Sequence, residues 1–236
     1  MRPIGFSTGA LAYGDFECGL ELVHEHGLQV VELSALRQNE LIPMLNAIPR
    51  LNLEGFHYIS IHAPSCFEPD WEAALRDRLR DEVARGWPIV VHPDAITDFG
   101  LWRELGEVVC IENMDKRKPI GRTAGELASV FRELPDATFC FDIGHARQVD
   151  PTMTEAYLIL RKFGPRLRQV HISEVNSRSK HDTLSYSSMV AFPKVARLIP
   201  AGVPLILETP VSGNDIESEI EKVRNALPLN LESMVA

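Results

Sequence analysis

The segment TFCFDIGHA, residues 138–146, decides the fold class, because a short apolar run ends there on a charged residue, Asp142. Short apolar runs that end on polar or charged residues recur along the whole chain. Runs this short and this continuously apolar are typical of strands that are buried on both faces in a parallel sheet. Eight such strands are predicted, over residues 4–7, 30–33, 58–62, 89–92, 108–112, 138–142, 170–173 and 205–208.

Segments with the spacing of an amphipathic helix lie between these runs. Phe16, Leu20 and Val23 recur at i, i+4 and i+7, and Gly27 follows where a helix would end. From the second run onward, the polar residues that end the runs are 20 to 37 residues apart, which suits one strand–helix unit. We therefore expect an α/β fold, a single (β/α)8 TIM barrel over residues 1–236. A doubly wound open sheet is the alternative, but no Gly-rich fingerprint follows any run.

Two helix boundaries and one interruption can also be predicted. Thr123 and Glu126 form the pattern of a capping box before an apolar stripe. Asn214 or Asp215 is expected to cap the last helix. Pro193 interrupts the segment before the eighth run, which makes the helical pattern there the least clear.

Composition restricts the class of protein. With 236 residues, 45% of them hydrophobic and 24% charged, the chain can bury the core of one α/β barrel. Four cysteines without a CxxC pair favour reduced thiols, especially Cys110 and Cys140 inside apolar runs. No signal-peptide pattern or membrane-spanning run is present, so a cytoplasmic location is expected, with no membrane partner. The net charge of −9 argues against general affinity for nucleic acid or anionic membranes.

The ends of the predicted strands carry an unusual number of metal-type ligands. The C-terminal ends of barrel strands are where TIM-barrel enzymes place their chemistry. A single histidine there would more often be a core or loop residue, but buried carboxylates and imidazoles that converge on one axis would stay unsatisfied without a cation. We therefore predict a divalent metal site. The residues at these ends are Glu32, His62, His92, Glu112, Asp142, His145, His171 and Glu208, with His181 in the loop after the seventh run.

Six motifs at these ends resemble the xylose isomerase-like superfamily, which includes endonuclease IV and the sugar isomerases and epimerases. They are HAP (62–64), HPD (92–94), IEN (111–113), FDIGHA (141–146), HIS (171–173) and ILET (206–209), and the resemblance covers nearly the whole chain. The resemblance implies that Glu112, Asp142, His171 and Glu208 are the shared ligands of a divalent metal. This mixed oxygen and nitrogen set suits Zn or Mn, with Mg or Co as further candidates.

The same resemblance implies roles for four more histidines. His62 and His92 match ligands of a second zinc in endonuclease IV, with Glu112 bridging the two metals. His145 matches a position that binds substrate in epimerases and a further zinc in the nuclease. His181 also matches a nuclease ligand, but the aspartate expected two residues before it is Ser179. This departure puts a third zinc in doubt.

The first hypothesis for the function is a sugar or sugar-phosphate isomerase or epimerase. It would work by proton transfer at a metal-bound enediolate, with Glu112 and Glu208 as catalytic proton carriers as well as ligands. These two glutamates are expected on opposite sides of the barrel, where they could address opposite faces of a substrate. The residues expected to contact that substrate are Glu32, His145, Lys180 and His181.

The alternative is a zinc-dependent abasic-site endonuclease or a related phosphodiesterase, for which nucleic acid would be the partner. Clustered histidines favour it, because several metals suit phosphoryl transfer. Ser179 speaks against it, and so does Ser65, which stands where that nuclease has an aromatic residue. Phe67 could still serve as an apolar wedge in a duplex. A barrel that only binds a ligand is a third hypothesis, which the intact four-ligand set disfavours.

Basic residues in the loops after the fifth and seventh runs narrow the expected substrate. Any one of them would ordinarily be a solvated loop charge, but five near one mouth of an acidic protein favour an anionic sugar derivative over a neutral sugar. They are Lys116, Arg117, Lys118, Arg178 and Lys180. Composition and motifs leave open whether the chain forms a homo-oligomer.

Overall fold

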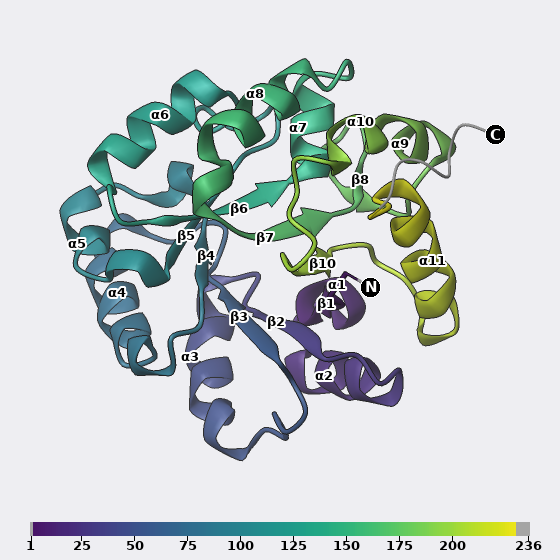
Figure 1. The fold of residues 1–236 in the computed structure, drawn as a ribbon. Helices are drawn as coiled ribbons and strands as arrows, with labels where there is room; N and C mark the ends of the chain where they lie inside the picture. The colour runs from purple at the N-terminus through teal and green to yellow at the C-terminus, as the bar shows by residue number, and fades with distance from the viewer. Residues whose placement is uncertain (1, 230–236) are drawn as a thin grey trace.

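The computed structural model describes residues 2–229 and contains a closed barrel of eight parallel strands (Figure 1). The order of strands around the barrel is β1 (Ile4–Ser7), β10 (Leu205–Leu207), β7 (Leu167–Ile172), β6 (Thr138–Asp142), β5 (Val109–Glu112), β4 (Ile89–Val91), β3 (Tyr58–His62) and β2 (Val30–Ser34). The predicted (β/α)8 TIM barrel is therefore confirmed, and the open sheet is excluded. Of the expected span 1–236, residues 1 and 230–236 lie outside the described part.

The strands are buried on both faces, as their continuous apolar runs predicted. Only the first one or two residues of β3, β6 and β7 are partly exposed or exposed. Outside the barrel, the strands contact one large apolar core that includes the fully buried Trp102, Phe6 and Phe139. Cys110 and Cys140 are buried free thiols that pack together with Val90.

The longer helices surround the barrel, and Figure 1 shows the circuit from purple α2 through α6 and α8 to yellow α11. Two short helices, α1 and α7, start at the residue that directly follows a strand. Among the described residues, no helix has the length and apolar character needed to cross a membrane. The helices are α1 (Thr8–Ala12), α2 (Phe16–Glu25), α3 (Gln38–Ala47), α4 (Glu72–Arg80), α5 (Phe99–Arg103), α6 (Ala124–Glu133), α7 (Ile143–Val149), α8 (Thr154–Phe163), α9 (Tyr186–Ala191), α10 (Pro193–Ala196) and α11 (Ile216–Ala226).

The predicted boundary of α6 is present, with one difference in its contacts. The Thr123 side chain accepts a hydrogen bond from the backbone N–H of Glu126. The Glu126 carboxylate, however, bonds to the backbone and guanidinium of Arg122 and so completes no box with Thr123. Asp215 occupies the N-cap position of α11, but its side chain makes no capping hydrogen bond there and accepts from the Ser212 hydroxyl instead. Pro193 is the first residue of α10, where its missing N–H costs no helical hydrogen bond.

A small antiparallel hairpin after β7 has no counterpart in the predicted elements. It pairs β8 (Glu174–Val175) with β9 (His181–Asp182). Ser179, in its connecting loop, has a φ of 52°, in the left-handed region that few non-glycine residues adopt. The hairpin places Lys180 and His181 at the C-terminal end of the barrel, where both line a pocket.

Candidate metal centre

The four residues that the motifs single out meet at the C-terminal ends of four strands. Glu112 ends β5, Asp142 ends β6, His171 lies near the end of β7, and Glu208 directly follows β10. One ligand atom from each of the four lies within 4.8 Å of the others. Three of these side chains are essentially inaccessible, while the Glu208 side chain keeps 14% of its surface exposed. The barrel thus assembles the predicted set from residues 96 positions apart in the chain.

Unsatisfied atoms inside this cluster fit a bound cation. Asp142 Oδ2, His171 Nδ1 and Glu208 Oε2 are buried and have no hydrogen-bond partner among the described residues. A buried polar atom without a partner typically costs about 1–3 kcal/mol. Three such atoms at one point, carrying carboxylate and imidazole lone pairs, match the donors that Zn or Mn accepts. The residues present therefore fit the metal that the motifs imply.

The carboxylate of Asp142 is held in place by its own local structure. Asp142 is the N-cap of α7, and its Oδ1 accepts a hydrogen bond of 2.6 Å from the backbone N–H of His145. The other oxygen, Oδ2, is thereby left for the centre. A Cβ on Gly144 would lie 2.5 Å from the Ser173 carbonyl oxygen, so only glycine lets α7 pass this close to the end of β7.

Asn113 extends the pairing of β5 and β6 by one residue. Its side-chain Nδ2 donates to the Asp142 carbonyl, and its Oδ1 accepts from the Asp142 N–H, both at 2.8 Å. This pair of hydrogen bonds fixes the backbone of two ligand residues, Glu112 and Asp142, relative to each other. Asn113 and Gly144 both stand inside quoted motifs, yet the sequence analysis assigned neither of them a role.

A second group of ligand atoms shares Glu112 with the first. His62 Nε2 and His92 Nε2 lie 3.3 Å and 3.2 Å from Glu112 Oε2. The three residues form a separate candidate metal group, and all are buried. The arrangement agrees with the bridging position of Glu112 that the motifs implied.

The pKa values in this cluster show how strongly it attracts positive charge. Burial acts to lower the pKa of His62, but the hydrogen bond to Glu112 and nearby carboxylates raise it to about 9. His145 behaves alike: Asp142 and Glu112 overcome burial and raise its pKa to about 10. Burial raises the pKa of Asp142 to about 7. Burial lowers the pKa of His92, whereas His62 and His145 hold protons in the metal-free cluster, and a divalent cation would compete with those protons.

The centre borders an open pocket of about 570 Å³, whose lining does not include Asp142 or His171. Glu112 and Glu208 line it, together with His62, His92 and His145. Between the two glutamates the barrel has β6 and β7, so they are not on opposite sides as expected. They instead approach His171 Nδ1 from two directions, at 3.5 Å for Glu112 Oε1 and 3.4 Å for Glu208 Oε2.

His145 and His181 stand side by side on the pocket wall, with ring centroids 5.5 Å apart. His181 Nδ1 is hydrogen-bonded to the Ser173 hydroxyl at 2.8 Å and lies 3.5 Å from Glu208 Oε2. Ser179 does not complete a third ligand group, because its hydroxyl is engaged with Gln148. Within residues 2–229, the pair belongs to no group of three metal-type ligands.

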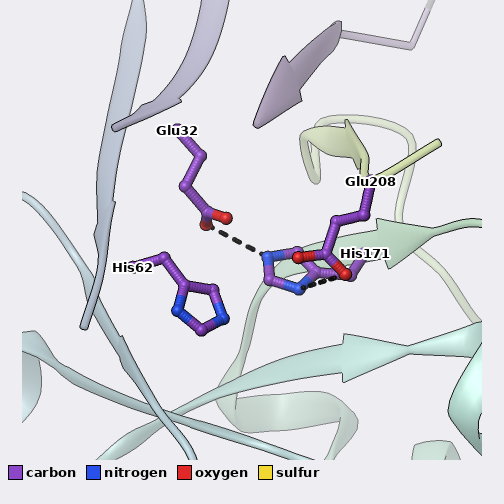
Figure 2. A group of neighbouring side chains, drawn as sticks. All are labelled: Glu32, His62, His171 and Glu208. Atoms are coloured by element: carbon purple, nitrogen blue, oxygen red, sulfur yellow. Dashed lines mark hydrogen bonds and ion pairs between the residues drawn. The ribbon is translucent and has the colours of Figure 1, made fainter. Parts of the chain in front are cut away.

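Glu32 was expected to contact substrate, and the structure places it elsewhere. Strand β2 runs on to Ser34, which pairs in register with His62, so Glu32 lies two residues below the strand end. Its carboxylate is completely buried and does not line the pocket. Figure 2 shows it facing a ring nitrogen of His171. Ser34 lines the pocket in its place.

The basic loop residues divide into two groups. Arg117, Lys118 and Lys180 line the pocket, whereas Lys116 and Arg178 do not. Arg117 is paired with Asp115 and Lys118 with Asp94. Among the described residues, Lys180 alone of the three has no carboxylate within ion-pair distance.

A larger cavity, of about 760 Å³, lies at the other end of the strands. Arg2, His57 and Arg168 line it, and its described walls contain no aspartate or glutamate. It offers no mixed carboxylate and imidazole set, so the candidate metal chemistry belongs to the smaller pocket.

Comparison with models of protein families finds no match, and comparison with curated proteins finds none either. Solved structures do match. Endonuclease IV from Thermus thermophilus superposes with a TM-score of 0.62 at 20% identity, covering 96% of this chain and 99% of that one. The 3-keto-D-glucoside 4-epimerase from E. coli gives 0.58 at 13% identity, with the same coverage.

A third structure, a proposed sugar phosphate isomerase/epimerase from Anabaena variabilis, gives a TM-score of 0.54 at 16% identity. It covers 98% of this chain and 88% of that one. Identities this low establish the shared fold alone, the (β/α)8 barrel. The three structures include both a nuclease and a sugar epimerase, so the shared fold does not by itself assign an activity.

Proposed function

We propose that this chain is a divalent-metal-dependent isomerase or epimerase that moves a proton between carbons of a sugar or sugar phosphate. The observation that carries the proposal is the pair Glu112 and Glu208, which flank His171 Nδ1 and line an open pocket. Proton transfer next to a carbonyl needs a base, an acid and a way to stabilise negative charge on oxygen. The two carboxylates can supply the first two.

The two glutamates differ in what surrounds them. Glu208 has a buried Oε2 with no hydrogen-bond partner among the described residues, and its side chain reaches the pocket. Glu112 is surrounded by His62, His92 and His145, all within 3.3 Å of its oxygens. We therefore assign the abstraction of the first proton to Glu208. Delivery of a proton to the substrate from the other direction is assigned to the side of the centre where Glu112 lies. A divalent ion held by the four-ligand set would neutralise charge that develops on the substrate oxygens.

Side chains on the pocket wall support an anionic substrate. Lys180 carries a charge that no described carboxylate compensates, whereas Arg117 and Lys118 are already paired. His145 and His181, on the same wall, can hydrogen-bond to hydroxyl groups. A sugar phosphate would place its hydroxyl and carbonyl oxygens near the centre and its anionic group near Lys180.

The experiment is solvent exchange. The metal-loaded enzyme is incubated in deuterated water with a panel of ketoses and their phosphates, and product formation and carbon-bound deuterium are both measured. We expect turnover with deuterium at one sugar carbon, because a carboxylate base shares its proton with water. Glu208→Gln should abolish both, while Glu126→Gln, on α6 outside the pocket, should change neither. Turnover without deuterium would indicate a hydride shift and would contradict the proton-transfer mechanism.

A phosphodiesterase acting on abasic DNA is the second candidate, and the group His62, His92 and Glu112 favours it. Two features weigh against it. Ser179 is engaged with Gln148, and Phe67 packs against the core beside Trp102, so it is not a free wedge. Nicking of an abasic-site duplex that is lost in His181→Ala, with no sugar turned over, would replace the isomerase proposal by this one.

A further inference from the structure

A chain of hydrogen bonds crosses the barrel interior directly beneath the candidate centre. Glu32 Oε2 accepts from the Ser60 hydroxyl at 3.0 Å and from Gln169 Nε2 at 2.7 Å. The same oxygen lies 3.0 Å from His171 Nε2. Figure 2 shows that Glu32 and Glu208 address the two different ring nitrogens of His171.

The orientation of the Gln169 amide is determined by its neighbours. The Tyr58 hydroxyl donates to Gln169 Oε1 at 2.8 Å, which leaves the amide nitrogen to face Glu32. A flipped amide would bring an oxygen to within 2.7 Å of a carboxylate oxygen, so the observed orientation is the stable one. Gln169 Nε2 is also 2.7 Å from His171 Nε2.

His171 Nε2 therefore has an acceptor, Glu32, and a donor, Gln169, within hydrogen-bond distance. With its proton on Nε2, the ring donates to Glu32, and the Nδ1 lone pair faces the centre. The contact of 2.7 Å between His171 Nε2 and Gln169 Nε2 then joins two donors, so both must direct their hydrogens to Glu32 Oε2. With its proton on Nδ1, the ring accepts from Gln169, and an N–H faces Glu208, so the ring cannot be a ligand there. A completely buried carboxylate needs donors far more than a neutral amide needs an acceptor.

We infer that Glu32 is a positioning residue: its carboxylate holds the Nε2 proton of His171 and so presents Nδ1 to the metal. The inference depends on the metal centre of the proposed function and not on the reaction. A carboxylate behind a metal-bound histidine fixes the ring and raises its basicity, and its loss typically weakens metal affinity about 10–100-fold.

Direct ligation by Glu32 is the competing arrangement, because Glu32, His62, His171 and Glu208 also form a candidate group. The hydrogen bonds favour the positioning role. Glu32 Oε2 and His171 Nε2 already have partners, whereas His171 Nδ1 and Glu208 Oε2 have none among the described residues. Glu32 Oε1 is likewise buried without a partner among the described residues, so the nitrogen of His171 that binds the metal decides between the two arrangements.

The test uses the full chain, labelled with ¹⁵N-histidine and loaded with zinc. Long-range ¹H–¹⁵N spectra should show His171 with a protonated Nε2 and a metal-bound Nδ1. Zinc affinity is measured by competition with a chelator. We expect Glu32→Gln to weaken binding about 10–100-fold, with the same number of zinc ions at saturation and a faster-exchanging Nε2 proton. The matched control is Ser60→Ala, which removes another donor to the same oxygen and should leave the affinity within about threefold.

Several results would overturn the inference. They are an Nε2-bound metal in the wild-type spectrum, an unchanged zinc affinity in Glu32→Gln, a zinc ion lost at saturation in that variant, or no zinc binding by the wild-type chain. The wild-type spectrum decides the matter even if the variant does not fold. No substrate is involved, so a chain that shows this signature but turns over no sugar would refute the proposed reaction and leave the role of Glu32 intact.

Discussion

Replacing Asp142 by asparagine should empty the metal centre without unfolding the barrel. Asparagine keeps an oxygen that can accept from the His145 N–H, and asparagine and aspartate are equally good N-caps. Its NH2 group, however, stands where Asp142 Oδ2 offers a lone pair to the centre. Burial raises the pKa of Asp142 to about 7, so the uncharged amide replaces a carboxyl whose negative charge burial already disfavours.

The size of the effect follows from sharing the binding free energy among the ligands. Protein zinc sites with four ligands are worth about 10–16 kcal/mol, or about 3 kcal/mol for each ligand. At 1.4 kcal/mol for each factor of ten, the loss of Asp142 should weaken zinc binding about 100-fold. The unfolding free energy of the metal-free protein should stay within about 1 kcal/mol of the wild type, because the cap is retained.

Chelator competition gives the zinc dissociation constant, and urea unfolding in the presence of excess chelator gives the stability. Asp15→Asn is the matched control, since Asp15 is also an N-cap aspartate, is exposed, and accepts from the Cys18 N–H. It makes the same change of charge without touching the pocket. Wild-type zinc affinity in Asp142→Asn would refute the assignment of this ligand.

Three further predictions concern the architecture and charge of the site. Gly144→Ala brings a Cβ to 2.5 Å from a backbone oxygen and should lower the urea-unfolding free energy by about 1–3 kcal/mol, whereas Gly125→Ala, whose Cβ meets nothing closer than 3.8 Å, should not. The pKa values of His62 and His145 are raised from 6.5 to about 9 and about 10, so protonation of these two histidines stabilises the metal-free fold below pH 6.5. That stabilisation is lost as pH rises through the two raised values. The melting temperature in chelator should therefore fall from pH 6.5 to 10, and a flat profile would contradict these pKa shifts. The double variant His62→Ala with His92→Ala should lower metal content, measured by elemental analysis, and still retain one metal; an unchanged count would mean that the two histidines hold no metal.

The sequence was sufficient for the barrel, because strands buried on both faces leave continuous apolar runs. It was also sufficient to place the four ligands together, since each stands at a strand end and parallel strands end on one face. The hairpin of β8 and β9 was missed because two-residue strands such as Glu174–Val175 have no periodicity to detect.

Other features depended on contacts between distant residues. How far Glu32 lies below the C-terminal end of the barrel depended on whether β2 ended at Glu32 or at Ser34. This difference of two residues moves the Glu32 side chain one layer down the barrel. The role of Asn113 comes from a contact with Asp142, 29 residues away, and the neutralisation of Lys118 comes from Asp94, 24 residues away. No local pattern contains such pairs.

The most direct test of the metal centre is an anomalous-difference map from crystals of the zinc-loaded protein. The account predicts a strong peak within about 2.3 Å of one atom each of Glu112, Asp142, His171 and Glu208, with Nδ1 as the histidine ligand. A map with no peak among these four residues would contradict it.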